Sequence, residues 1–264
     1  MTTIIHISDL HIHGSNKHPD NINAKTLVSY IMKNYASQPI TILITGDITD
    51  DGSEEQYENA LNILKPLVEA KFTVLPTPGN HDYGYKGNIY TEKSQQLFQE
   101  YMLAKLINHK EAENPSIKME NIYPMITEID DTIFIGVDSV VGNENQLLHF
   151  ASGEVGEPQR IAIDKLLKKY QGNKSIVVYF HHHPFDRKFG MEMDDAKKLL
   201  RMLASRVDIL CFGHDHKSEA YNGQFDIDWM LASGKSTEQT PHDRLQFREI
   251  ILRHNLTSVA LTSF

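Results

Sequence analysis

The chain has 264 residues, a formal net charge of −9, 40% hydrophobic residues and 23% charged residues. This length fits one large domain or two small ones, and the balance of apolar and charged residues is that of an ordinary globular protein. The acidic charge and the lack of a dense basic cluster argue against a large duplex nucleic acid as partner, because lysine and arginine are what bind a phosphate backbone.

The sequence also predicts a location. Cys211 is the single cysteine, which rules out an internal disulfide and suits a reducing compartment. No apolar run reaches the length of a membrane span, so no membrane partner is expected. Residues 1–8 resemble a strand rather than a signal peptide. We therefore expect a cytoplasmic protein.

The first third of the chain alternates apolar strand-like runs with stripes at helical spacing. Residues 2–8, 40–45 and 72–76 are predicted strands, and residues 21–37 and 57–68 are predicted helices. The second helix follows Ser53-Glu-Glu-Gln56, a capping-box pattern. This β-α-β-α-β order predicts parallel strands with helices packed on them.

Residues 84–120 interrupt this alternation with a Tyr- and Gly-rich stretch and a helical segment, and form a candidate substrate-facing insertion. Beyond it the sequence predicts a hairpin, two further strands separated by a helix, and a final antiparallel pair. The segments are 122–128 with 132–138, a helix from Glu157, strand 175–180, helix 194–206, strand 207–212, and 245–253 with 256–264. No repeat or linker divides the chain, so residues 1–264 are expected to form a single domain.

Polar, metal-competent side chains follow five of the apolar strands. They are Asp9 and His11, Asp47 and Asp50, Asn80 and His81, His181 to His183, and His214 with His216. In a parallel sheet these strand ends share one edge, where α/β proteins bind ligands. A mixture of carboxylate, amide oxygen and imidazole suits Mn, Fe, Zn or Co ions. The pattern predicts a metal centre at this edge.

These five blocks, in this order, resemble the calcineurin-like metallophosphoesterase superfamily, and most closely its small bacterial cyclic-nucleotide-type phosphodiesterases. The motifs are Asp9-x-His11, Gly46-Asp47-x-x-Asp50, Gly79-Asn80-His81-Asp82, His182-x-Pro184 and Gly213-His214-x-His216. The resemblance spans residue 4 to about residue 234. It implies a four-layer α/β/β/α sandwich with two mixed β-sheets and a dinuclear metal site at the carboxyl ends of the strands.

The resemblance also implies a role for each motif residue. One metal would be held by Asp9, His11, Asp47 and His216, and the second by Asp47, Asn80, His182 and His214. Asp47 would bridge the two ions, and a hydroxide between them would attack phosphorus in line. His81 would bind phosphate and protonate the leaving oxygen, and the Asp50 carboxylate would orient the His81 imidazole.

Three further histidines lie next to motif residues. The family pattern His-x-Pro selects His182 as the ligand of its triplet, and strand alternation then turns His181 and His183 away from the metals, toward packing positions. His13, which forms His-x-His with His11, could line the pocket, but a place on a surface loop is expected.

Departures from the family patterns narrow the expected activity. Asp51 and Asp82 stand where the protein phosphatases of the superfamily carry Arg and Glu, and the tyrosine ligand of purple acid phosphatases is absent from the second block. We expect a hydrolase of small phosphorylated substrates, chiefly phosphodiesters. A phosphomonoesterase, a nuclease of short or single strands, and a non-catalytic scaffold of the same fold are the alternatives.

Overall fold

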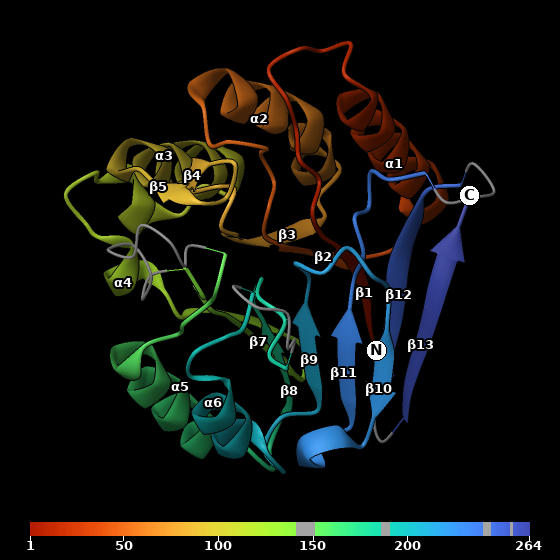
Figure 1. Cartoon of the computed structure of the whole chain (residues 1–264). Coiled ribbons are helices and arrows are strands. Elements are labelled where there is room, and N and C mark those ends of the chain that lie inside the picture. Colours follow the sequence, from red (N-terminus) through yellow and green to blue (C-terminus); the bar gives the residue numbers. More distant parts are fainter. Residues whose placement is uncertain (141–150, 186–190, 240–243, 254–255) are drawn as a thin grey trace.

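The computed structural model describes residues 1–140, 151–185, 191–239, 244–253 and 256–264. Two large β-sheets lie face to face in it, with helices on the outer side of each (Figure 1). None of the described helices combines the length and the apolar character that crossing a membrane requires. The predicted α/β class with mixed sheets is confirmed.

The first sheet contains the strands from both ends of the chain. Its order is β13 (Leu256–Ser263), β12 (Gln246–Arg253), β1 (Thr2–Ile7), β2 (Ile40–Thr45) and β3 (Thr73–Thr77). Strands β1, β2 and β3 are parallel, whereas β12 runs antiparallel to β1 and β13 antiparallel to β12. The predicted C-terminal strand pair is therefore present, and it extends the parallel part of the sheet.

The second sheet is formed by the middle of the chain. Its order is β10 (Ala220–Asn222), β11 (Trp229–Ala232), β9 (Ile209–Phe212), β8 (Ser175–Tyr179), β7 (Thr132–Gly136) and β6 (Met125–Ile129). Strands β7, β8, β9 and β11 are parallel, and the antiparallel pair β6–β7 is the predicted hairpin.

Each central strand is buried on both of its faces. Along β1, Ile5 and Ile7 contribute to the apolar core under the helices, while Ile4 points into the core between the two sheets. In β2, Ile42 likewise packs toward the helices and Leu43 toward the other sheet. This alternation explains why the strands are nearly continuous apolar runs, since polar residues fit only where the strands end.

Helices α1 (Pro19–Tyr35) and α2 (Glu54–Glu69) cover the outer face of the first sheet, and α5 (Glu157–Tyr170) and α6 (Ala196–Leu203) cover that of the second. Ser53 is the N-cap of α2, as the sequence predicts, but its side chain makes no capping hydrogen bond. The Gln56 side chain instead accepts hydrogen bonds from the backbone N–H groups of Asp50 and Asp51. It therefore holds the loop that follows β2.

The segment 84–120 divides into a hairpin and a helical part. The elements are β4 (Gly84–Tyr85), β5 (Ile89–Tyr90), α3 (Glu92–Phe98), the π-helix η1 (Gln99–Leu106) and the 3₁₀-helix η2 (Lys110–Glu113), followed by α4 (Met119–Ile122). The helical part packs against α2, where the rings of Phe98 and Tyr101 contact Tyr57. The hairpin approaches the strand ends: a Cβ atom on Gly87 would lie 2.6 Å from His81 Nε2.

Candidate metal centre

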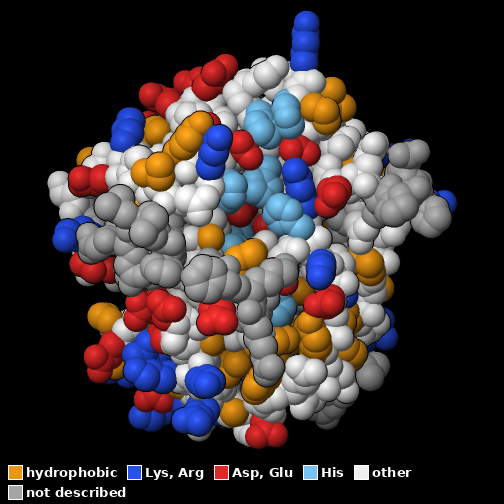
Figure 2. Space-filling model, in the orientation of Figure 1, with side chains coloured by type: hydrophobic (Ala, Val, Ile, Leu, Met, Phe, Trp, Pro, Cys, Tyr) orange, Lys and Arg blue, Asp and Glu red, His pale blue; other side chains and the backbone are white. Residues whose placement is uncertain are grey.

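The loops after β1, β2, β3, β8 and β9 converge at one edge of the two sheets. They bring together Asp9 and His11, Asp47, Asn80 and His81, His181 and His182, and His214 and His216. In the space-filling view, histidine side chains gather across the middle of one face with acidic side chains among them (Figure 2). Most of these side chains are buried, so the site lies at the base of this region rather than on the rim.

The backbone of this region is strained. Asp9, His11, Asp47, His214 and His216 have φ angles of 53°, 44°, 49°, 76° and 56°. Non-glycine residues rarely adopt this left-handed conformation, which costs on the order of 1–3 kcal/mol per residue. Such strain persists where the surrounding structure fixes it, and it is concentrated at functional sites. Here it turns five metal-competent side chains away from the strand direction and toward one another.

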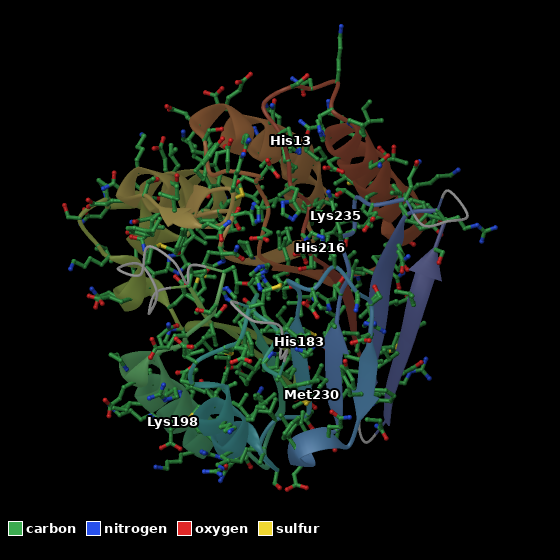
Figure 3. The ribbon with its side chains drawn as sticks, viewed as in Figure 1. His13, His183, Lys198, His216, Met230 and Lys235 are labelled. Atoms are coloured by element: carbon green, nitrogen blue, oxygen red, sulfur yellow. The ribbon has the colours of Figure 1, made fainter. Side chains whose placement is uncertain are left out.

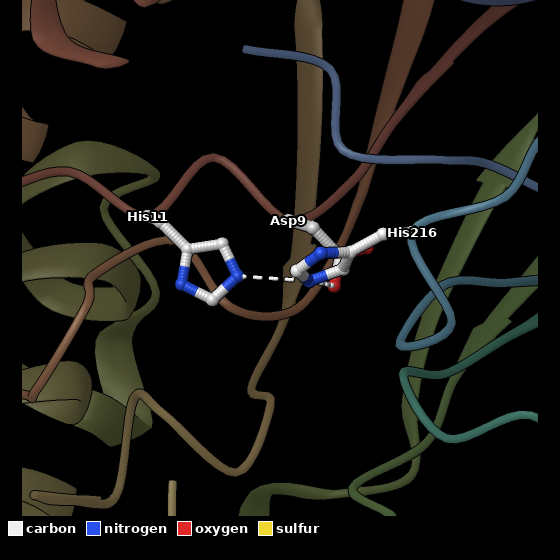
Figure 4. A group of neighbouring side chains, drawn as sticks. All are labelled: Asp9, His11 and His216. Atoms are coloured by element: carbon white, nitrogen blue, oxygen red, sulfur yellow. Dashed lines mark hydrogen bonds and ion pairs between the residues drawn. The ribbon is translucent and has the colours of Figure 1, made fainter. Parts of the chain in front are cut away.

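One group of donor atoms consists of Asp9, His11 and His216 (Figure 4). The Nε2 atoms of His11 and His216 lie 3.1 Å apart, and His216 Nε2 lies 3.4 Å from Asp9 Oδ1. His11 Nε2 is also 3.8 Å from Asp47 Oδ2. Two imidazole nitrogens approach this closely only when one holds a proton or both face a cation. The structure thus brings together the four residues predicted for the first metal.

A second group lies on the other side of Asp47 and contains Asn80, His181 and His214. His181 Nε2 is 3.3 Å from Asp47 Oδ2, 3.0 Å from Asn80 Oδ1 and 3.1 Å from His214 Nδ1. Its other nitrogen, Nδ1, lies 2.8 Å from the backbone oxygen of Thr45. Since a carbonyl oxygen only accepts, Nδ1 carries the proton of the neutral ring and Nε2 is left as a donor atom for a metal.

This arrangement reverses the predicted places of His181 and His182. The expectation that His181 points away from the group is wrong. His182 instead directs Nδ1 to Ser139 Oγ at 2.8 Å, and its ring packs beside that of His214. The reason is that β8 ends at Tyr179, so the alternation of side chains along a strand does not extend to the histidine triplet. His183 packs its ring against Phe185 and Phe212.

Asp47 stands between the two groups and is tightly fixed. Its Oδ1 accepts a hydrogen bond from the His81 backbone N–H at 2.9 Å, which leaves Oδ2 facing His11 and His181. A Cβ atom on Gly79 would lie 2.3 Å from Asp47 Oδ1, so only glycine fits there. Burial raises the pKa of Asp47, but the opposing effect of His181 and His81 is stronger and holds the pKa well below its usual value. Asp47 is therefore an anion in this site.

The predicted contact between Asp50 and His81 exists, but through different atoms. His81 Nδ1 lies 2.6 Å from the backbone oxygen of Asp50, so the carbonyl, not the carboxylate, orients this imidazole. The Asp50 carboxylate faces two other histidines, with Oδ1 3.4 Å from His11 Nδ1 and Oδ2 3.6 Å from His13 Nδ1. The interaction with His11 lowers the pKa of Asp50. Its role as a carboxylate is to position His11.

Asp82 is a structural residue of the site that sequence reasoning treated only as a departure from a family pattern. Its carboxylate accepts hydrogen bonds from the backbone N–H groups of Ile48, Thr49 and Gly79 at 3.2, 2.9 and 2.9 Å. Burial, and next the negative charge of Asp47, raise its pKa to about 6. Asp82 thus joins the loop after β2 to the loop after β3. Its place in the motif Gly79-Asn80-His81-Asp82 could have indicated from the sequence that it belongs to the site.

The donor set fits a pair of metal ions. Asp9 Oδ1 and His214 Nε2 are buried and have no hydrogen-bond partner within the described ranges; the same holds for His182 Nε2, which lies outside both groups. Burying polar atoms without partners is unfavourable unless something else satisfies them. Burial lowers the pKa of His181 but the facing Asp47 carboxylate raises it, to about 9. In the metal-free protein a proton therefore stands at Nε2, where a cation would bind.

Residues 2–218 match the family model described as Calcineurin-like phosphoesterase. The chain belongs to this family. The two groups of donor atoms around Asp47 agree with a metal site of this family of phosphoesterases. The predicted resemblance is confirmed, and the strand-end pattern was sufficient to find it.

Two relatives of this calcineurin-like phosphoesterase carry diesterase names. A probable glycerophosphodiester phosphodiesterase GpdQ of Arcobacter nitrofigilis is 27% identical over 201 residues, 74% of this chain and 62% of that protein. A probable cyclic nucleotide phosphodiesterase of Coxiella burnetii is 26% identical over 229 residues, 81% of this chain and 75% of that protein. The chain thus spans less than two thirds of the Arcobacter protein.

Solved structures share the fold at low identity. GAP50, described as the anchor in the inner membrane complex of Plasmodium, aligns with a TM-score of 0.65 at 16% identity over 99% of this chain and 84% of that one. A purple acid phosphatase from yellow lupin aligns with a TM-score of 0.61 at 13% identity, over 99% of this chain and 51% of that one. One title names an anchor and the other an enzyme, so this likeness concerns the fold alone.

Proposed function

We propose that this phosphoesterase is a dinuclear metal-dependent phosphodiesterase acting on small phosphorylated molecules. The position of Asp47 Oδ2 supports this proposal most directly. It lies 3.8 Å from one imidazole nitrogen, His11 Nε2, and 3.3 Å from another, His181 Nε2, each of which belongs to a separate cluster of donor atoms. A carboxylate shared between two such clusters is the arrangement that two closely spaced dications need, because a bridging anion offsets their repulsion.

The ligand sets follow from the two groups. Asp9, His11, Asp47 and His216 would hold the first ion, and Asp47, Asn80, His181 and His214 the second. Bound there, the ions would supply Lewis acidity, which stabilises charge on a phosphoryl group and activates water for attack on phosphorus. The left-handed backbone at five of these seven residues, all except Asn80 and His181, keeps their side chains in place before metal binds.

His81 is proposed to protonate the leaving oxygen. Its Nδ1 donates to the Asp50 carbonyl, so the ring is held in one orientation and Nε2 is the nitrogen available to a substrate. Its ring centroid lies 4.6 Å from that of His11, which places it beside the first group without joining it. A proton held at Nε2 passes to the departing alkoxide as the phosphorus–oxygen bond breaks. Gly87, in the turn of the β4–β5 hairpin, lies close to His81 Nε2. A Cβ atom at this position would lie 2.6 Å from Nε2, so a glycine is needed there.

Small diesters are the substrate class that the surroundings favour. A hollow of about 220 Å³ adjoins His216 and is lined by Ser218, Gly234, Lys235, Glu238, Gln239 and Gln246. It is polar and has room for a small hydroxylated substituent rather than a polymer. The names of the Arcobacter and Coxiella relatives point to the same bond type.

The test is metal analysis followed by turnover of a bis-aryl phosphodiester, an aryl phosphomonoester, a cyclic nucleotide, a glycerophosphodiester and a single-stranded oligonucleotide. We expect about two ions per chain and faster turnover of small diesters than of the monoester or the oligonucleotide. Asp47→Asn is the control, and it should lose metal and turnover together. Faster monoester turnover would contradict the diesterase assignment, and a metal-loaded protein inactive on every substrate would leave the scaffold alternative.

A further inference from the structure

A third group of metal-competent side chains lies beside the metal centre and is not used by the proposed reaction. It consists of His13, His18 and Asp20, whose ligand atoms all lie within 4.8 Å of one another. His13 Nε2 is 3.5 Å and His18 Nδ1 is 3.6 Å from Asp20 Oδ2. Figure 3 labels His13 above Lys235 and His216. We name these three residues the α1 cluster.

His13 is more rigidly held than a surface-loop residue would be. Its backbone N–H donates to Asn21 Oδ1 at 2.8 Å, and its backbone oxygen accepts from the amides of Asn21 and Asn59 at 2.8 and 3.0 Å. Only 26% of its side chain is exposed. The expected place on a surface loop is therefore only partly right, because two asparagine side chains fix the His13 backbone and most of the imidazole is covered.

The Asp50 carboxylate lies beside His13 without a hydrogen bond to it. Its Oδ2 faces His13 Nδ1 at 3.6 Å, while His13 Nε2 lies 3.5 Å from Asp20 Oδ2. The negative charge of Asp50 favours a cation near this imidazole. The same carboxylate faces His11 Nδ1 through Oδ1 at 3.4 Å. One anion thus lies between one histidine of the metal centre and one of the α1 cluster.

His18 and Asp20 come from the start of helix α1. His18 is the N-cap residue, and its Nδ1 accepts from the Asp20 backbone N–H at 3.3 Å. The rings of His13 and His18 lie with their centroids 3.5 Å apart. Asp20 exposes only 12% of its side chain and already has a cation beside it, since Lys235 Nζ lies 3.0 Å from Oδ2. The cluster therefore combines two imidazoles, one carboxylate and a place where positive charge is bound.

We propose that His13, His18 and Asp20 bind one divalent cation of the zinc type, separate from the pair at Asp47, with His18 Nδ1 exchanging its hydrogen bond from the Asp20 backbone N–H for the ion. Two histidines and one carboxylate are a common three-ligand set for such an ion, with water or another group as the fourth ligand. The charges agree: Asp20 and Asp50 carry two negative charges near the cluster, and Lys235 supplies one positive charge. The Lys235 ammonium occupies part of the cation's place, and it competes with the metal for Asp20.

The test measures metal stoichiometry and cobalt absorption rather than activity. The full chain is stripped of metal by a chelator and titrated with Co²⁺, then with Zn²⁺. His18→Asn removes the imidazole but keeps a residue that caps helices well, so the start of α1 is preserved. This variant should bind about one ion fewer per chain than the wild type and lack one component of the visible cobalt spectrum. The matched control is His109→Asn, the same change at the N-cap of η2, which should leave the stoichiometry unchanged.

Lys235→Met separates a metal site from a network of ion pairs. If Lys235 competes with a metal, the variant should bind the additional ion at least about tenfold more tightly, because a positive charge beside the ligand is gone. If the cluster is only an ion-pair network, the same change removes the ammonium group beside Asp20, and the variant binds no additional metal. Equal stoichiometry of the wild type and His18→Asn, or no gain in affinity in Lys235→Met, would overturn the proposal. The His18→Asn outcome does not depend on the two ions at Asp47. Lys235 also faces His216 of the first group, so a gain in affinity supports the proposal only when it belongs to the ion that His18→Asn removes.

Discussion

Asp50 and His81 are joined by a backbone carbonyl and not by a carboxylate: His81 Nδ1 lies 2.6 Å from the Asp50 backbone oxygen. The carboxylate of Asp50, which was expected to orient His81, therefore faces another histidine. The peptide group of Asp50 orients the proposed acid, and its side chain orients His11 at 3.4 Å. A substitution at position 50 therefore removes the second function and leaves the first.

The first prediction concerns Asp50→Ala. Removing the carboxylate should weaken metal binding at the first group by about 10- to 100-fold. The reason is that the Asp50 carboxylate faces His11 Nδ1 and so orients His11 Nε2 toward the metal. Turnover should recover when metal is saturating, since the carbonyl that holds His81 remains. Metal titration with turnover measured at each concentration tests this. Asp51→Ala is the matched control, as that carboxylate accepts only from the Ser53 backbone N–H at 3.2 Å among its described contacts.

A different result would support the role that the sequence predicted for Asp50. If Asp50→Ala binds metal as the wild type does but stays slow at saturating metal, its carboxylate acts on His81 in the working enzyme. The Asp50 side chain would then have to move away from His11 when substrate or metal binds.

His81→Ala is the second prediction. The variant should retain its metals, because the His81 contact with Asp47 is made by the backbone N–H. Turnover of a diester with an alkyl leaving group should fall by about 10²- to 10⁴-fold, the usual contribution of a general acid. The loss should be smaller with a nitrophenyl leaving group, which departs without a proton. Metal analysis and the two rates check the prediction, and loss of metal from this variant would make the assigned role wrong.

Much of this site could be predicted because the strands are so uniformly buried. In β1 and β2 every residue is buried, so the first polar residues after them mark the edge of the sheet. Asp9 and Asp47 were found in this way. Their neighbours across the edge followed from the same pattern in the other strands. The fold class was predictable for the same reason, since parallel strands buried on both faces are nearly continuous apolar runs.

The ring directions of the histidine triplet could not be predicted from the sequence in this way. Alternation applies only within a strand, and β8 stops before His181, so the direction of each ring is set by contacts distant in sequence. The Thr45 carbonyl holds His181, and Ser139 holds His182. Neither contact has a signal in the local sequence. The left-handed φ angles of Asp9 and His214 are likewise set by the folded loops, although Asp and His adopt this conformation more readily than most residues.

The third prediction uses these contacts to compare His181→Asn with His182→Asn. Asparagine can reproduce the Nδ1 contact of either histidine while removing Nε2. His181→Asn should lose the second metal, because Nε2 is the atom that faces Asp47 and His214. His182→Asn should keep both metals, because the donor atoms grouped around Asp47 are those of His181 and His214. Both side chains are fully buried, so each variant also controls for the stability cost in the other.

Metal content and thermal unfolding of the two variants decide between the assignments. If His182→Asn loses a metal and His181→Asn does not, the placement predicted from the His-x-Pro pattern is correct for the metal-bound protein. The structure then represents an arrangement that metal binding changes.

The fourth prediction concerns His6, a fully buried histidine of β1 whose Nε2 lies 2.8 Å from Thr45 Oγ1. Burial, and next the positive charge of Arg248, lower its pKa to about 3. Because the unfolded chain binds this proton near the ordinary pKa of about 6.5, the unfolded state is favoured as pH falls below that value. The contribution of His6 to stability is therefore fully present above pH 6.5 and lost progressively toward pH 3.

His6→Gln should reduce the fall in unfolding free energy over this range by up to about 1.4 kcal/mol per pH unit. Urea unfolding of both proteins at several pH values measures the difference, and parallel pH profiles would show that the buried imidazole is protonated without cost.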